Sequence, residues 1–524
     1  MLGDPGPTGW LRGTGRFARG CDLRFLTLGL VATAAVAGEP RPALEVVATL
    51  AVTGELVAVG GADAASVRRP ADMAARFEFQ ERGGPADPDG PAVVRRYRRA
   101  EATMRFGDAA VRGELAAAAR DVLVVRRGTT PVPYLAEGYL TDEEYDLLDV
   151  PFDSLLIDEL LPGHRVTVGA VWSIAPDVAA GLLAIDTVES GGLEASLVEV
   201  VDGNAQISLS GIIDGAADGV PTHVTVEATL RVPLQDGPAT RTGAAASATG
   251  DAEEGTVAPL DDALDAVAGE PAGHDLRGPV TDANAVIIER RQASHVAPGF
   301  DVEARVTVSR RPLGDREGVA TEDGQADEEP PAADAVVAAS RPDAQRRGGK
   351  GAAGMVWHGD RAGRFDLVRD ARWRKVEDGE DGLVMRLVDH GALVGQCSIT
   401  ALPAGERSAA PTREEVERDW SRSLAGQVGR IDGTEVFTRT DGVRIVRIAS
   451  SGTAGRLPFR WVHYVLATPG GQRAAATFMF EESSAERFGT ADRSLVEGLV
   501  PASGGAEDRP TAAALPPAGA RRAR

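Results

Sequence analysis

The stretch Phe365–Val500 constrains the fold more than any other part of the chain, because its local patterns agree with one another. Short segments in which apolar and polar residues alternate follow one another, separated by turn residues such as Asp441-Gly442. Alternation with a period of two is typical of half-buried strands. The stretch therefore predicts an antiparallel sheet built from hairpins.

Two helices interrupt this pattern. Thr412 and Glu415 form a capping box, after which apolar residues recur at every fourth position, and Gly429 stands where a left-handed C-cap is expected. A last helix begins at Thr490. The element order is three strands, a helix, four strands and a helix, so residues 355–500 are predicted to form a small α+β sandwich.

This element order, together with the opening residues Phe365-Asp366-Leu367 and Trp373, resembles the PsbP-like superfamily of small exported domains. The resemblance covers residues 365–500. Known members are mostly non-enzymatic proteins outside the cytoplasm that bind other proteins or envelope components, so the resemblance implies a binding role. It transfers no binding residue, because no ligand motif of the family is present.

The N-terminus has the pattern of a signal peptide. Arginines up to Arg24 precede an apolar run, Phe25–Ala37, that is shorter than the roughly 20 residues needed to span a bilayer. The run ends in Ala35-Val36-Ala37, a small-x-small pattern that signal peptidase cleaves. We expect residues 1–37 to be removed before Gly38, which predicts an exported protein, periplasmic or extracellular and with no membrane span.

Residues 38–311 predict a second α+β domain, and 61–92 are expected to form a loop. Thr141 and Glu144 form a capping box before a short helix, and another helix is expected over 176–185. Strands are predicted at the following ranges: 38–60, 93–106, 121–127, 194–201, 205–213, 222–232, 285–291 and 301–310. This half is similar, by analogy only, to the curved sheets of bacterial envelope carrier proteins.

Three segments lack apolar periodicity and are predicted to be disordered: an insertion at 235–276, a linker at 312–354 and a tail at 501–524. The predicted fold class is therefore α+β, with two domains, each an antiparallel sheet with flanking helices, joined by a disordered linker.

Composition and motifs argue against several chemistries. The net charge of −22 disfavours nucleic-acid binding, which needs a basic face. The histidines and cysteines show no zinc spacing, and neither a phosphate loop nor a nucleophile elbow occurs. Cys397, the one cysteine left after cleavage, and His463 are both expected in the core. The sequence thus predicts no cofactor, no metal, no catalytic residue and no enzyme.

The leading hypothesis is an exported, non-catalytic protein that binds an unknown envelope or extracellular partner. One alternative is a carrier of a lipid or small hydrophobic ligand, with a cavity bounded by Trp172, Leu182, Leu183 and the strands at 194–233. The other is a hydrolase with no recognisable motif, because catalytic groups can assemble from distant positions.

Overall fold

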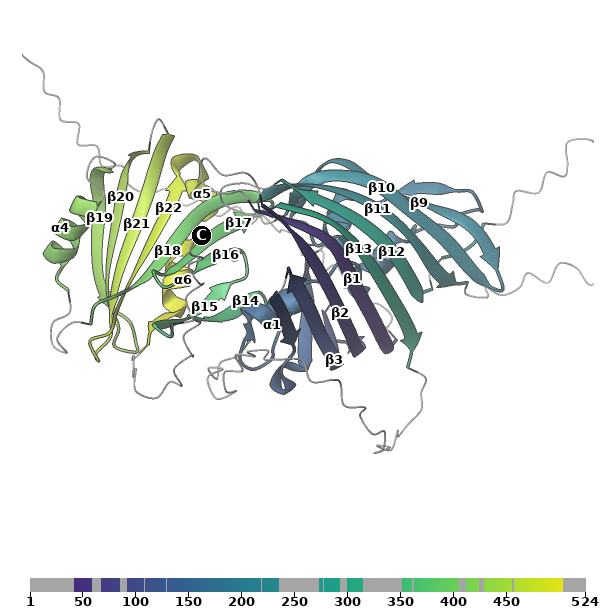
Figure 1. The fold of residues 1–524 in the computed structure, drawn as a ribbon, viewed down its shortest axis with the longest axis horizontal. Coiled ribbons are helices and arrows are strands. Elements are labelled where there is room, and N and C mark those ends of the chain that lie inside the picture. Colours follow the sequence, from purple (N-terminus) through teal and green to yellow (C-terminus); the bar gives the residue numbers. More distant parts are fainter. Residues whose placement is uncertain are drawn as a thin grey trace, which may run out of the picture. The chain divides into compact units, whose positions relative to one another are not determined.

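The computed structural model describes three β-sheets and a few short helices (Figure 1). All described residues belong to one compact unit, Arg41–Arg524. The described ranges are 42–58, 67–84, 92–107, 109–128, 130–217, 219–234, 273–276, 278–292, 299–313, 351–360, 362–404, 411–423, 428–454 and 457–502.

The largest sheet has 12 strands, and every pairing in it is antiparallel. Its order is β6-β5-β3-β2-β1-β13-β12-β11-β10-β9-β8, with β4 paired to β3. The strands are β1 (Leu44–Ala58), β2 (Val67–Gly83), β3 (Ala92–Phe106), β4 (Ala109–Glu114), β5 (Asp121–Arg127), β6 (Thr130–Tyr134), β8 (Val171–Ser173), β9 (Thr187–Val201), β10 (Asn204–Ala217), β11 (Val220–Pro233), β12 (Asp282–Arg291) and β13 (Gly299–Pro312).

Alternation decides which face of this sheet is buried. In β10, Ile207 and Leu209 are buried while Ser208 between them is only half-buried, and β11 alternates in the same way. The buried side chains form one hydrophobic core with three short helices. These helices are α1 (Asp142–Leu148), α2 (Ser154–Ile157) and α3 (Pro176–Leu182).

A sheet of seven strands follows in the C-terminal part, in the order β16-β17-β18-β22-β21-β20-β19. Both of its faces are covered in part, because Ile445 packs in one core with α6 while its neighbour Val446 packs in another with α4. The elements are β16 (Trp373–Asp378), β17 (Leu383–Asp389), β18 (Ala392–Leu402), α4 (Arg413–Ser423), β19 (Val428–Thr438), β20 (Arg444–Ala454), β21 (Leu457–Ala467), β22 (Arg473–Glu481), α5 (Ala485–Phe488) and α6 (Ala491–Gly498).

A small sheet of four strands connects segments that are far apart in the sequence. Its order is β23-β15-β14-β7, and β14 pairs in parallel with β7 through Val356–Leu140 and Trp357–Thr141. The strands are β7 (Leu140–Thr141), β14 (Met355–Gly359), β15 (Phe365–Asp370) and β23 (Leu499–Pro501).

The predicted α+β class, with helices flanking each sheet, is wrong. Of the described residues, 63% lie in strands and 14% in helices, and the sheets are mostly antiparallel. The reason lies in element length. The capping box at Thr141 does start a helix, but α1 is only 7 residues long, whereas β1, β2 and β3 have 15, 17 and 15 residues. A cap fixes where a helix starts, and packing decides how far it continues.

Local predictions succeeded where alternation was strong. The expected strands at 121–127, 205–213 and 222–232 correspond to β5, β10 and β11. The expected loop at 61–92 is wrong, since most of it is β2, whose inner positions include small residues such as Ala71 and Ala75. Gly429 lies inside β19 rather than at a helix end.

Several predicted segments lie outside the described residues, in whole or for the most part: the signal peptide 1–37, the insertion 235–276, the linker 312–354 and the tail 501–524. Among the helices that are described, none has the length and apolar character needed to cross a membrane.

Candidate functional site

The three residues predicted to bound a ligand cavity are packed against the large core. Leu182 and Leu183 are buried, and Trp172 donates its Nε1–H to the carbonyl of Leu160 at 2.9 Å. Three cavities of about 30, 10 and 20 Å³ lie elsewhere in the same part of the chain, and none is lined by these residues. Each is of the size that one or two water molecules need.

A buried ion pair and a part-buried one adjoin these cavities and attach α2 and its flanking residues to the large sheet. Arg95 donates two hydrogen bonds to Asp153, at 2.7 and 2.6 Å, and a third to Glu81. Arg310 likewise forms a bidentate ion pair with Asp158. Burial alone would raise the pKa of Asp153, but the charge and hydrogen bonds of Arg95 lower it below its usual value. These contacts are consistent with a structural role.

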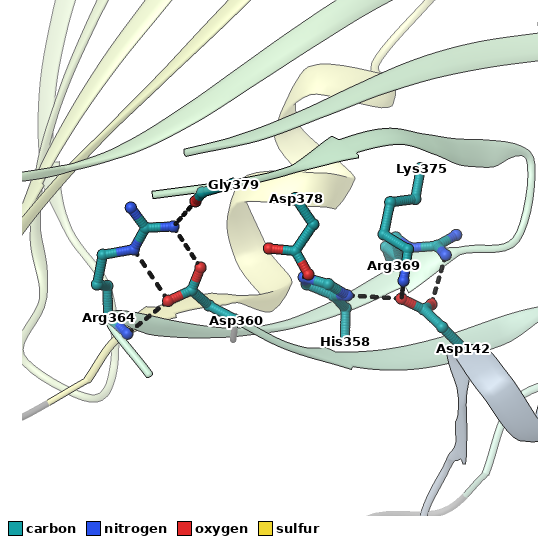
Figure 2. Close-up of polar contacts among 8 residues, drawn as sticks. All are labelled: Asp142, His358, Asp360, Arg364, Arg369, Lys375, Asp378 and Gly379. Atoms are coloured by element: carbon teal, nitrogen blue, oxygen red, sulfur yellow. Dashed lines mark hydrogen bonds and ion pairs between the residues drawn. The ribbon is translucent and has the colours of Figure 1, made fainter. Parts of the chain in front are cut away.

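A second buried cluster gathers at the four-stranded sheet, and we call it the His358 cluster. Its members are Asp142, His358, Arg369, Lys375 and Asp378 (Figure 2). Nδ1 of His358 lies 2.5 Å from Oδ2 of Asp142, and Nε2 lies 3.8 Å from Oδ2 of Asp378. Arg369 binds the other oxygen of Asp142, and Nζ of Lys375 lies 3.4 Å from Oδ2.

The electrostatics of the His358 cluster centre on Asp142. Burial opposes its charge, but the hydrogen bond from His358 and the charges of Arg369 and Lys375 lower its pKa to about 2. An ionised carboxylate only accepts, so Nδ1 of His358 donates to it. Nε2 of His358 has no hydrogen-bond partner among the described residues. His358 is only 3% exposed, so its ring is out of reach of a substrate.

Next to the cluster, Asp360 and Arg364 form a further ion pair (Figure 2). Arg364 also donates to the backbone carbonyl of Gly379, so the pair connects the end of β14 to the turn after β16. Within the described ranges, no group of three or more His, Cys, Asp or Glu side chains is arranged to hold a metal ion.

Sequence reasoning missed the His358 cluster. The capping box of Thr141 and Glu144 correctly places Asp142 in the first turn of a helix, but its partner His358 lies 216 positions away. No local spacing connects the two residues. The only available signal was a histidine in a short apolar segment, Val356-Trp357-His358.

Cys397 lies in the core, as the sequence predicted, whereas His463 is only half-buried. Cys397 is fully buried, and burial raises the pKa of its thiol. His463 stacks on Trp420 with ring centroids 4.4 Å apart, and its Nδ1 lies 2.9 Å from Oγ1 of Thr477. Burial lowers the pKa of His463 to about 4, so the ring is neutral at physiological pH.

An accessible feature of the C-terminal part is strand β19, which ends the seven-stranded sheet and, among the described strands, pairs with β20 alone (Figure 1). Three of its large apolar side chains are exposed: Ile431 at 37%, Val436 at 44% and Phe437 at 42%. Helix α4 lies beside it, and Thr434 donates to Glu417 of that helix. We call residues Gly433–Thr438 of this strand the β19 edge.

Comparisons with known proteins give weak likenesses. No protein-family model and no curated protein matches the chain. The solution structure of cyanobacterial PsbP (CyanoP) from Synechocystis sp. PCC 6803 is similar at 12% identity over 30% of this chain and 96% of that chain, with a TM-score of 0.24. Lipovitellin, solved for its lipid–protein interactions, is similar at 8% identity over 53% of this chain and 26% of its own, with a TM-score of 0.25. Neither likeness identifies a family.

Proposed function

We propose that this is an exported protein that works without catalysis, by binding another protein of the envelope or the extracellular space. The observation that carries the proposal is the β19 edge, whose outer side pairs with no other strand of the described ranges and whose apolar side chains are exposed on both faces. Open edges of this kind favour pairing with other chains, and natural proteins usually cover or charge them. The unpaired β19 edge is therefore suited to pairing with a partner protein.

The sequence and the interior both favour this proposal. The signal-peptide pattern supports export, and residues 355–500 are proposed as a PsbP-like domain on their element order. In the interior, the ionisable groups described above bind one another. The cavities beside Arg95 and Arg310 are water-sized, whereas ligand pockets usually measure about 300–1,000 Å³.

The proposal is tested by recovering the partner. The full chain carrying a C-terminal tag is expressed in its own host, crosslinked with formaldehyde and purified from the envelope and the medium. We expect a specific protein that is absent when an unrelated exported protein carries the same tag. Recovery of the same background proteins from both baits, in repeated experiments, would contradict the proposal.

Export makes a separate prediction. Mass spectrometry of the protein purified from the host should show a mature N-terminus at Gly38, with the basic and apolar leader removed. Changing Ala35 and Ala37 together to Lys should block cleavage and retain the precursor, because signal peptidase needs small side chains there. Full-length precursor in the cytoplasm of wild-type cells would refute export.

A further inference from the structure

The β19 edge has the regular geometry that strand addition requires. Its pairing with β20 is shifted twice near the start, between Val428 and Arg430 and between Ile431 and Gly433. From Gly433 to Thr438 the register runs without a shift. Shifts twist a strand and hinder pairing, whereas a regular stretch presents an even row of N–H and C=O groups. The open part of the edge is therefore short and well defined.

Both faces of this stretch offer apolar contact. Val436 pairs with Val446, which packs beneath α4, and Phe437 pairs with Ile445, which packs in the core on the opposite face. Successive residues of a strand point to opposite faces. A strand placed beside β19 would therefore bury Val436 with its side chains on the α4 face of the sheet, and Phe437 with its side chains on the opposite face.

The charges within the β19 edge and beside it already have partners. Glu435 accepts hydrogen bonds from Arg447 and Arg493. On the α4 side, Glu417 accepts from Arg413 and from Thr434. An incoming strand therefore finds backbone groups and apolar side chains rather than an unpaired charge, and a charged side chain would gain little there.

We propose that an extended, uncharged segment of the partner protein adds to β19 as a further strand, next to α4. This inference rests on the proposed function and specifies its mode. Backbone hydrogen bonds to the edge supply affinity, and apolar side chains over Val436 and Phe437 supply specificity.

A second copy of this chain fits the edge less well than an extended segment. Antiparallel pairing of two β19 strands about a two-fold axis perpendicular to the sheet would place both α4 helices on the same face. The outer surface of α4 is densely charged, with Arg413, Glu414 and Asp419 exposed. Two six-residue strands also supply only part of the roughly 1,200–2,000 Å² that stable interfaces bury. A single extended segment brings no second α4 helix to that face, and its small contact area suits a transient complex.

The experiment places a photo-crosslinking amino acid at Val436 of the full chain in its own host. A matched probe at Leu393, which is 53% exposed on β18 of the same sheet, serves as the control. We expect the partner to crosslink at position 436 at least tenfold more than at position 393. In protein with the probe at 436, Phe437→Lys should lower the yield at least tenfold, whereas Leu393→Lys should leave it unchanged. Unfolding midpoints of both variants verify that they fold.

The outcomes separate the two proposals. If wild-type protein recovers a partner that crosslinks equally well at 393, or that Phe437→Lys does not weaken, strand addition is overturned and the binding function stands. If affinity purification recovers no partner at all, the binding function itself fails. If position 436 crosslinks only to a second copy of this chain, the edge forms a homodimer and the inference is wrong.

Discussion

At the scale of single residues, buried charges in this protein depend on their partners. Asp142 illustrates this, because it contacts a histidine, an arginine and a lysine in a site with little access to water. A buried ion pair often adds little to stability compared with an apolar pair, but removing one member leaves the others uncompensated. The cost of a substitution therefore differs sharply between buried and exposed pairs.

Asp142→Ala should lower the free energy of unfolding by about 3–5 kcal/mol, because His358 and Arg369 would remain buried without their carboxylate. The measurement is urea unfolding of the full chain at pH 7. The control is Arg68→Ala, which breaks an exposed ion pair with Glu55 and should leave the free energy of unfolding almost unchanged. Equal effects of the two substitutions would show that the His358 cluster does not stabilise the fold.

The same residue makes stability depend on pH. The pKa of Asp142 falls from 3.8 to about 2 on folding, so its stabilising effect is complete above about pH 4 and disappears as pH falls towards 2. The shift corresponds to about 2 kcal/mol. Unfolding free energies measured from pH 5 to pH 2 should fall less steeply for Asp142→Asn than for the wild type. Parallel curves would mean that the pKa of Asp142 is unshifted.

At the scale of elements, the sequence predicts what is local. The alternation in β10 and β11 has strong apolar contrast, so both strands were predicted. Strand β2 was missed because its buried positions include Ala75 and even Glu81, whose buried carboxylate pairs with Arg95 of β3. Such a residue looks like a loop residue until its neighbour in the sheet is known. The His358 cluster was missed for the same reason: Asp142 and His358 lie 216 positions apart, so no local pattern connects them.

One side chain, Trp420, holds helix α4 against the seven-stranded sheet. Trp420 packs with Val446 and Trp461, donates to Oγ of Ser450 at 3.2 Å and stacks on His463. Trp420→Ala should cost about 3–5 kcal/mol. It should also raise the pKa of His463 from about 4 towards its ordinary value of 6.5, because burial is what lowers it.

An NMR titration of the His463 ring tests this docking, together with urea unfolding. Arg422→Ala, at an exposed position of the same helix, is the matched control and should change neither measurement. A His463 pKa that stays near 4 in Trp420→Ala would show that the sheet alone, rather than α4, keeps the ring from water.

At the scale of the whole molecule, the four-stranded sheet takes strands from both sides of the predicted linker at 312–354. Strand β7 precedes that linker, and β14, β15 and β23 follow it. The sequence predicted two domains with separate sheets, since pairing between strands so far apart leaves no local pattern. The predicted boundaries remain predictions, but contact between β7 and β14 means that residues of both halves share one sheet and one buried cluster.

Hydrogen exchange of the full chain should reveal this coupling. Because Asp142 binds side chains of β14, β15 and β16, Asp142→Asn should speed amide exchange in α1 and in β14 together, by about tenfold for each 1.4 kcal/mol lost locally. The amides of β11 and β21, two strands that hold no member of the His358 cluster, should speed up less, because only the loss of global stability reaches them. Faster exchange in α1 alone would show that the cluster stabilises the helix without coupling it to β14. A uniform increase across all strands would mean that the molecule unfolds as one unit, with the cluster contributing to global rather than local stability.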